Sequence, residues 1–169
     1  MFAKLDIYRA SWFALLLAFA TIAGAWVFEW AGYAPCELCL QQRYAYYIGV
    51  PVAVLAVAAA AMDVQRMARA LLVMLAIIFA ASAVFGVYHS GVEWGFWPGP
   101  SGCSGGGAGA GKPSPADMGD FLKQLKNARV VPCTEAAIRI FGLSLAGWNA
   151  VISAAIVTLA LKGVQRREI

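Results

Sequence analysis

The sequence contains little charge. Of its 169 residues, 13% are Asp, Glu, Lys or Arg and 62% are hydrophobic. A soluble globular domain is nearer one quarter charged and half apolar, so this composition excludes an ordinary water-soluble protein and indicates a membrane protein. Acidic residues are almost absent from the long apolar runs, where only Glu29 occurs, near the end of the first run. Transport paths through membranes usually contain such acids, so their scarcity argues against a transporter.

Four long stretches of the chain are almost free of charge. An apolar helix needs about 20 residues to cross the hydrocarbon core, where it satisfies its own backbone hydrogen bonds. The stretches are 12–30, 44–62, 70–88 and 140–161. The first is too long for the apolar part of a signal peptide, so we expect it to be retained. The predicted fold is therefore an all-α membrane protein, a four-transmembrane-helix bundle that forms one domain over residues 1–169.

The basic residues predict the side of the membrane on which each loop lies. Cytoplasmic segments carry an excess of Lys and Arg. Seven basic residues flank the predicted helices in three short segments: Lys4, Arg9, Arg66, Arg69, Lys162, Arg166 and Arg167. Both termini and the loop between the second and third helices are thus predicted to be cytoplasmic, and loops 31–43 and 89–139 to lie outside. The net charge of +4 reports this topology and does not indicate a nucleic-acid partner.

The four cysteines fall in the two outer loops. Cys36 and Cys39 lie in the first, and Cys103 and Cys133 lie in the second. Disulfides persist on the outer side, and an even count suggests two bridges, although the sequence leaves three pairings open. Four thiols also match the ligand number of a structural zinc site, but the second pair is not closely spaced. We rank a redox role before structural disulfides, rank zinc last, and expect no metal.

The first cysteine pair forms the motif PCELCLQQR at the entrance to the second predicted helix. The spacing C-x-x-C is typical of reactive thiolates. Arg43 follows Cys39 by four residues, which places both on one face of a helix, and a fixed cation there favours a thiolate. Arg43 could instead be only an interfacial anchor. His89, the one histidine of the chain, closes the third predicted helix. It could be only a capping or snorkelling residue, or it could flank a small polar ligand together with Arg43.

A glycine-rich segment in the second outer loop imitates a phosphate-binding loop. Residues 106–112 read GGAGAGK, close to the pattern G-x-x-x-x-G-K-[ST]. Pro113 stands where Ser or Thr would bind magnesium, and no strand precedes the segment, so the phosphate-loop interpretation fails. We expect a flexible linker that carries Cys103. The following stretch SPADMGDFLKQLKNA has a capping signal and apolar residues at helical spacing, which predict a short amphipathic helix on the membrane surface.

Taken together, these features resemble the bacterial disulfide bond formation protein B (DsbB) family over essentially the whole chain. The resemblance depends on the motifs PCELCLQQR, YHSGVEWG, VPCTEA and FGLSLAGWN. It implies a thiol:quinone oxidoreductase of the bacterial inner membrane. Such an enzyme would reoxidise a periplasmic thioredoxin-fold dithiol oxidase, similar to DsbA, and pass the electrons to a membrane quinone. That system keeps the bacterial periplasm oxidising.

The resemblance also implies a role for each cysteine. Cys103 would form the mixed disulfide with the partner, whose thiolate attacks the disulfide between Cys103 and Cys133. Cys133 would then exchange with Cys36. Cys39 would be left as the thiolate that donates electrons to the quinone.

The same resemblance implies a quinone site. Arg43 and His89 would position the quinone, with ubiquinone expected in preference to menaquinone. Gln41 and Gln42 depart from the aromatic or acidic pair expected before Arg43.

Three alternatives stay open at this point. A vitamin K epoxide reductase-like enzyme also pairs a C-x-x-C with a quinone, but usually places the motif before a late helix. A membrane scaffold would use the disulfides only to brace its loops. A metal-binding or transport protein would contain bound zinc. Asn149 in the last helix is expected to hydrogen-bond across the bundle in any of these readings.

Overall fold

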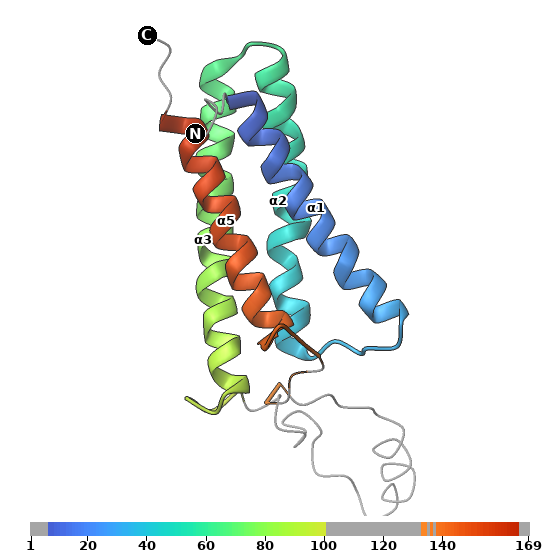
Figure 1. The fold of residues 1–169 in the computed structure, drawn as a ribbon. Coiled ribbons are helices and arrows are strands. Elements are labelled where there is room, and N and C mark those ends of the chain that lie inside the picture. Colours follow the sequence, from blue (N-terminus) through green and yellow to red (C-terminus); the bar gives the residue numbers. More distant parts are fainter. Residues whose placement is uncertain (1–6, 101–132, 135, 137, 166–169) are drawn as a thin grey trace, which may run out of the picture.

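The computed structural model describes residues 7–100, 133–134, 136 and 138–165. These contain four long helices: α1 (Ile7–Trp30), α2 (Glu37–Ala61), α3 (Gln65–Glu93) and α5 (Leu145–Gln165). Each is long and apolar enough to cross a membrane. The predicted all-α bundle of four membrane-spanning helices is confirmed (Figure 1). The predicted amphipathic helix and the glycine-rich segment lie outside the described residues.

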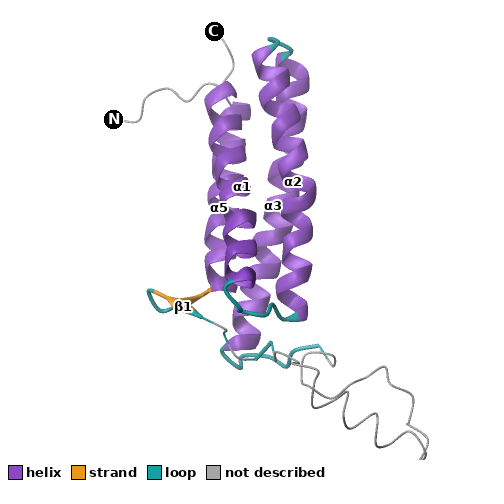
Figure 2. Cartoon of the chain, turned by 90° about the vertical axis from the view of Figure 1, so that its right-hand side faces the viewer, coloured by secondary structure: helices purple, strands orange, loops and turns teal. Residues whose placement is uncertain are grey.

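The four helices are arranged around a common axis so that each packs mainly on two neighbours. α1 packs on α2 and α5, and α3 packs on the same two helices, whereas α1 and α3 have few contacts with each other. The start of α1, the turn between α2 and α3, and the end of α5 lie at one end of the bundle (Figure 2). The connection from α1 to α2 and a small hairpin lie at the other end. Successive helices therefore run in opposite directions, as in an up-and-down bundle (Figure 2).

All four helices begin or end beyond the predicted limits. α2 begins at Glu37, before the predicted start at Tyr44, and α3 continues to Glu93, past the predicted end at Tyr88. α1 begins at Ile7, before the predicted start at Trp12. α5 begins at Leu145, after the predicted start at Ile140, and continues to Gln165, past the predicted end at Leu161. The predictions followed uncharged runs, but helices also continue through polar residues in the interfacial region. As a result, the connection from α1 to α2 is shorter than the predicted loop 31–43. The connection from α3 to α5 covers residues 94–144 and is as long as the predicted loop 89–139, because α5 starts later than predicted.

Small residues line the contacts between the helices. Ala10, Ala14 and Ala18 are fully buried along one face of α1. Gly49 in α2 lies against the ring of Phe79 in α3, where an added methyl group would come within 2.6 Å of the ring. Small side chains let membrane helices approach closely and gain van der Waals contact. The opposite faces carry exposed large apolar side chains, as expected for surfaces in contact with lipid: Leu16, Phe19, Ile77 and Val84.

A polar cluster inside the bundle links three helices. The hydroxyl of Tyr46 in α2 donates to Oδ1 of Asn149 in α5. The Asn149 amide donates in turn to Ser82 of α3, and Ser153 also donates to Ser82 at 3.2 Å. The expectation that Asn149 bonds across the bundle is confirmed. Such bonds fix the register of helices that otherwise meet through apolar contacts.

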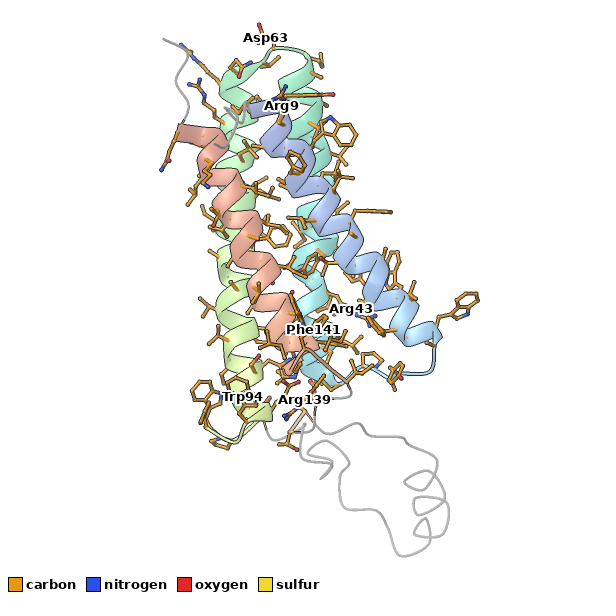
Figure 3. The ribbon with its side chains drawn as sticks, in the orientation of Figure 1. Arg9, Arg43, Asp63, Trp94, Arg139 and Phe141 are labelled. Atoms are coloured by element: carbon orange, nitrogen blue, oxygen red, sulfur yellow. The ribbon has the colours of Figure 1, made fainter. Side chains whose placement is uncertain are left out.

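A short β-hairpin, with two residues in each strand, precedes α5. β1 (Arg139–Ile140) pairs antiparallel with β2 (Leu143–Ser144). The turn residues Phe141 and Gly142 both have positive φ, 52° and 83°, as a tight hairpin turn of the primed type requires. The Phe141 side chain is 95% exposed. Figure 3 shows Phe141 and Arg43 at the same end of the bundle, with Arg9 and Asp63 at the opposite end.

Candidate functional site

The first turn of α2 positions both cysteines of the C-x-x-C motif. Cys36 is the N-cap residue, with extended backbone (φ −74°, ψ 171°), and its sulfur accepts a hydrogen bond from the Cys39 backbone N–H at 3.2 Å. Cysteine replaces the usual Ser, Thr or Asp at this position. Because a helix N-terminus carries partial positive charge, a thiolate is favoured there.

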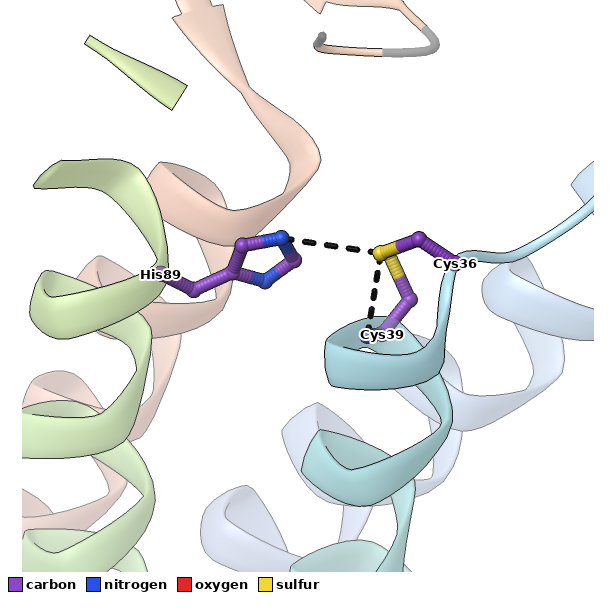
Figure 4. A group of neighbouring side chains, drawn as sticks. All are labelled: Cys36, Cys39 and His89. Carbon is purple, nitrogen blue, oxygen red and sulfur yellow. Dashed lines mark hydrogen bonds between the residues drawn. The ribbon is translucent and has the colours of Figure 1, made fainter. Parts of the chain in front are cut away.

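His89 reaches Cys36 from α3. Its Nε2 lies 3.6 Å from the Cys36 sulfur, as Figure 4 shows. Its Nδ1 lies 3.0 Å from the side-chain nitrogen of Gln42. Gln42 lies on α2, one helical turn after Leu38. His89 and Gln42 are both buried, at 1% and 8% exposure. The His89 imidazole is therefore held between the Cys36 sulfur at the start of α2 and the Gln42 amide further along the same helix.

Glu93 completes this group from the last turn of α3. Its Oε1 lies 3.9 Å from Nε2 of His89, and its side chain is 6% exposed. Its other carboxylate oxygen has no hydrogen-bond partner among the described residues. Nε2 of His89 thus faces two acceptors, the Cys36 sulfur and the Glu93 carboxylate.

These contacts change the acidity of Cys36. The hydrogen bond from the Cys39 side chain contributes most, burial opposes it, and the hydrogen bond from His89 acts in the same direction as Cys39. Together they lower the pKa of the Cys36 thiol from its ordinary 9.0 to about 5. Cys36 is therefore the thiolate of the reduced pair at neutral pH.

A mostly apolar cavity of about 460 Å³ lies beside the motif. Residues of α1, α2, α5 and the hairpin line it, in the region where α1 diverges from α5 (Figure 1). Its lining includes Cys39, Gln42 and Arg43 from α2, with Phe28, Phe141 and Trp148 from the other elements. Neither Cys36 nor His89 is among the described residues that line it. The two sulfurs of the motif therefore face different surroundings.

Arg43 is held at this cavity by an ion pair. Its Nη1 donates to Oε2 of Glu29 in α1, and its Nη2 lies 3.5 Å from the carbonyl of Ala25. The Arg43 side chain is only 11% exposed. Arg43 thus has a partner on the neighbouring helix and does not simply extend into the aqueous phase as an interfacial anchor does.

Cys133 returns to the motif from the second outer loop. It is 1% exposed and belongs to one buried cluster with Cys36, Leu38 and Val92. Cys133 is disulfide-bonded, whereas Cys36 and Cys39 are free thiols. Cys103 lies outside the described residues, so its predicted pairing with Cys133 stays a prediction.

The donor atoms of Cys36, Cys39 and His89 lie within 4.8 Å of one another. This spacing would suit a soft metal ion as well as thiol chemistry. The zinc site considered from the sequence needs all four cysteines as thiolates, and Cys133 is not available in that form. Among the described residues, the free thiols Cys36 and Cys39 therefore do not make up the four-cysteine zinc site considered from the sequence.

Sequence reasoning placed Cys36, Cys39, Arg43 and His89 near one another, and the fold brings these four residues to one end of the bundle. That His89 and Arg43 flank one ligand stays a prediction; in the structure His89 contacts Cys36, whereas Arg43 lines the cavity. Sequence reasoning treated Gln42 only as a departure from the family pattern. Glu93 was missed, although its position four residues after His89 on one helix was a usable signal.

Comparison with known proteins identifies the family of the chain. The family model described as disulfide bond formation protein DsbB matches residues 8–162. An uncharacterised protein of Rickettsia prowazekii (strain Madrid E) is 22% identical over 154 residues, which covers 90% of this chain and 85% of that protein. No solved structure matches the chain. Since the family model covers nearly the whole chain, including every helix and cysteine of the site, this protein is a multi-pass membrane protein of the DsbB family of disulfide-forming oxidoreductases.

Proposed function

We propose that this chain is a thiol:quinone oxidoreductase that takes electrons from the dithiol of a periplasmic thioredoxin-fold oxidase and transfers them to a membrane quinone. The placement of the two C-x-x-C sulfurs supports this most directly. Cys39 lines the apolar cavity, whereas Cys36 does not line it and belongs to a buried cluster with Cys133, against which Cys39 also packs. One thiol pair thus contacts both a space for a hydrophobic electron acceptor and the loop cysteine that would deliver the electrons.

A quinone head group suits the cavity in size and polarity. Ligand pockets typically measure about 300–1,000 Å³, with a few polar groups in an apolar lining. The two carbonyl oxygens of a quinone accept hydrogen bonds, and Gln42 and Arg43 present donors at the wall. A bound quinone supplies an acceptor for two electrons and two protons. Ubiquinone is the first expectation, and menaquinone is the alternative.

The electron balance fits this acceptor. Oxidation of the Cys36 and Cys39 thiols to one disulfide releases two electrons and two protons, as many as the reduction of one quinone to hydroquinone consumes. Cys39 is the sulfur that would contact the acceptor, because it is the one at the cavity wall. Cys36, as a thiolate, would then form the new bond to the Cys39 sulfur.

The thiol side of the reaction proceeds by exchange without net electron loss. The partner's thiolate would attack Cys103, so that the bond between Cys103 and Cys133 breaks and Cys133 leaves as a thiolate. Cys133 would attack the sulfur of Cys36, with which it shares a buried cluster, and Cys39 would leave with the electron pair. The partner's second thiolate would then attack the partner's own sulfur in the mixed disulfide and release Cys103 as a thiolate. Cys103 would attack the Cys133 sulfur of the Cys133–Cys36 disulfide, so that the Cys103–Cys133 bond forms again and Cys36 leaves as a thiolate.

We further propose that the cysteines face the periplasm and that both termini are cytoplasmic. Arg9, Arg66 and Lys162 lie in the elements that gather at the end of the bundle away from the cysteines (Figure 2). The positive-inside rule places this end in the cytoplasm. The orientation can be tested with a variant that lacks Cys36 or Cys39, in which the other cysteine of the motif is an unpaired thiol. This thiol is labelled with a membrane-impermeant maleimide in intact cells whose outer membrane has been permeabilised.

The proposal is tested by quinone reduction in detergent. Purified protein is mixed with ubiquinone and a reduced thioredoxin-fold dithiol oxidase, and loss of the oxidised quinone's absorbance is followed. We expect rapid loss, which disappears in Cys39→Ser while the same variant still captures the partner through Cys103. Quinone turnover that persists in Cys39→Ser would rule out the relay.

The same assay separates two of the alternatives. A scaffold with structural disulfides, or a metal-binding protein, would reduce neither ubiquinone nor menaquinone while remaining well folded. Zinc analysis of the purified protein would then distinguish those two. A vitamin K epoxide reductase-like enzyme would also reduce quinone, and the feature that argues against it is the position of the C-x-x-C motif before the second helix instead of before a late one.

A further inference from the structure

Gln42 connects the cavity to the Cys36–His89 pair. Its side chain is among the cavity lining, and its nitrogen lies 3.0 Å from Nδ1 of His89. It is 8% exposed, whereas the adjacent Gln41 is exposed. A glutamine is buried at low cost only when its amide is hydrogen-bonded, so the bond to His89 accounts for its position.

The bond from Gln42 determines where His89 carries its proton. The amide nitrogen of glutamine can only donate, so Nδ1 of His89 must accept. A neutral imidazole with an accepting Nδ1 carries its proton on Nε2. Nε2 is the nitrogen that faces Cys36 at 3.6 Å and Glu93 at 3.9 Å. The Nε2–H group is therefore aimed at two acceptors.

We propose that Gln42 is a positioning residue for the thiol:quinone reaction: by holding His89 in the Nε2–H tautomer, it keeps a hydrogen-bond donor aimed at the Cys36 sulfur. The inference rests on the proposed function for its chemical consequence. Its structural content, the tautomer of the single histidine, can be measured independently of any activity.

The donor matters in the step that releases Cys36. When a thiolate attacks the Cys133 sulfur of a Cys133–Cys36 disulfide, a new bond to Cys133 forms and the bond to Cys36 breaks. The electron pair of the broken bond goes to the Cys36 sulfur, and no proton or further electron is required. A leaving thiolate departs faster when its negative charge is stabilised, which is what an N–H donor provides.

Glu93 gives the same N–H group a second acceptor. While Cys36 is in a disulfide, its sulfur is a poor acceptor, and Nε2–H can face the Glu93 carboxylate instead. When the Cys36 thiolate forms, the charge-assisted bond to sulfur becomes the better one. Gln42 keeps the donor on Nε2 in both redox states.

The groups around Cys36 and His89 come from three elements. Cys39 and Gln42 lie on its own helix, and His89 and Glu93 lie on α3. Cys133 approaches from the outer loop, but it is disulfide-bonded and does not titrate in that state. Glu37, in the first turn of α2, is exposed.

Nitrogen-15 NMR of protein labelled at histidine tests the tautomer directly, because the chain contains a single histidine. In the wild-type protein we expect an unprotonated Nδ1 and a protonated Nε2 in both the oxidised and reduced states. In Gln42→Leu the preference should be lost, and in Gln42→Glu, where the carboxylate can only accept, Nδ1 should become protonated. Gln41→Leu is the matched control and should give the wild-type spectrum.

Kinetics test the consequence. At saturating quinone, Gln42→Leu is expected to lower kcat for oxidation of the partner by about tenfold, the effect of losing one hydrogen bond to a charged group. Gln41→Leu should retain the wild-type kcat. The quinone concentration must saturate because Gln42 also lines the cavity, so its loss is expected to raise KM as well.

Each outcome is decisive. A Gln42→Leu spectrum identical to wild type, or a Gln42→Glu protein with an unprotonated Nδ1, would overturn the inference. An altered tautomer with an unchanged kcat would overturn the positioning role. If Gln42→Leu does not fold, Gln42→Met replaces it with an unbranched side chain that also lacks the donor. Failure of the wild-type protein to reduce quinone would instead refute the proposed function and leave the tautomer result intact.

Discussion

Arg43 in α2 forms an ion pair with Glu29 in α1, and Arg43 lines the same cavity as Cys39. The pair is asymmetric, because the Arg43 side chain is 11% exposed and that of Glu29 is 45% exposed. Arg43 lines the cavity, while Glu29 lies toward the surface. Glu29 thus restrains a cation at the wall of the cavity proposed to hold the quinone.

Replacement of Arg43 should weaken quinone binding more than thiol exchange. We expect Arg43→Ala to raise the KM for quinone about tenfold, the consequence of losing about 1.4 kcal/mol of hydrogen bonding to a carbonyl oxygen. The rate of exchange with the reduced partner, measured in a single turnover without quinone, should change little. Arg66→Ala, which removes an exposed arginine at the opposite end of the bundle, is the control. An unchanged KM in Arg43→Ala would return Arg43 to an anchoring role.

Cys36 should titrate far below an ordinary thiol. Its pKa of about 5 predicts that thiolate absorbance in the reduced protein is present at neutral pH and disappears as the pH falls through about 5. A Cys103→Ser/Cys133→Ser background limits the signal to the motif. Because the largest cause is the hydrogen bond from Cys39, Cys39→Ala should move the midpoint upward more than His89→Ala does.

The same shift makes a prediction for stability with a defined sign. The pKa of Cys36 is lower in the folded than in the unfolded protein, so its thiolate stabilises the fold fully above about pH 9. This contribution is lost as the pH falls through about 5. A midpoint near 9 in the reduced wild-type protein would contradict the contacts of Cys36 with Cys39 and His89.

Much of the fold could be predicted from the sequence, because lipid imposes simple rules. An uncharged run near 20 residues long predicts a spanning helix, and all four helices were found in this way. The ends were less accurate because the rule detects the hydrocarbon core only. The first turns of α2 and the last turn of α3 lie beyond it, and these turns carry Cys39, His89 and Glu93.

The residue types of the site could also be predicted, but their contacts could not. The spacing of Cys36, Cys39 and Arg43 on one segment identified a redox motif from local sequence alone. The contact between His89 and Cys36 joins residues 53 positions apart, and it depends on the depth and rotation of α3 against α2. Hydropathy does not encode that rotation. It follows from packing of small residues such as Gly49 against Phe79.

The packing of α2 on α3 is itself testable at Gly49. A methyl group there would lie 2.6 Å from the Phe79 ring, so Gly49→Ala should lower the free energy of unfolding by about 1–3 kcal/mol through overpacking. Gly24→Ala is the matched control, since an added methyl group at that helical position meets no atom within 4 Å. Thermal unfolding in the same detergent compares the two. Equal stability of both variants would mean that α2 and α3 pack less closely at this level.

The hairpin turn offers a final prediction that links strain to the cavity. Phe141 has a φ of 52°, which a bulky side chain rarely adopts, and its ring is 95% exposed while contributing to the cavity lining. Such a conformation costs about 1–3 kcal/mol and is usually retained for function. Phe141→Gly should therefore relieve the strain and raise the unfolding temperature, while raising the KM for quinone because the mouth of the cavity loses an apolar wall. Phe141→Leu keeps an apolar side chain together with the strain and should retain most of the quinone affinity. A Phe141→Gly protein with wild-type KM would show that the ring contacts lipid and takes no part in binding.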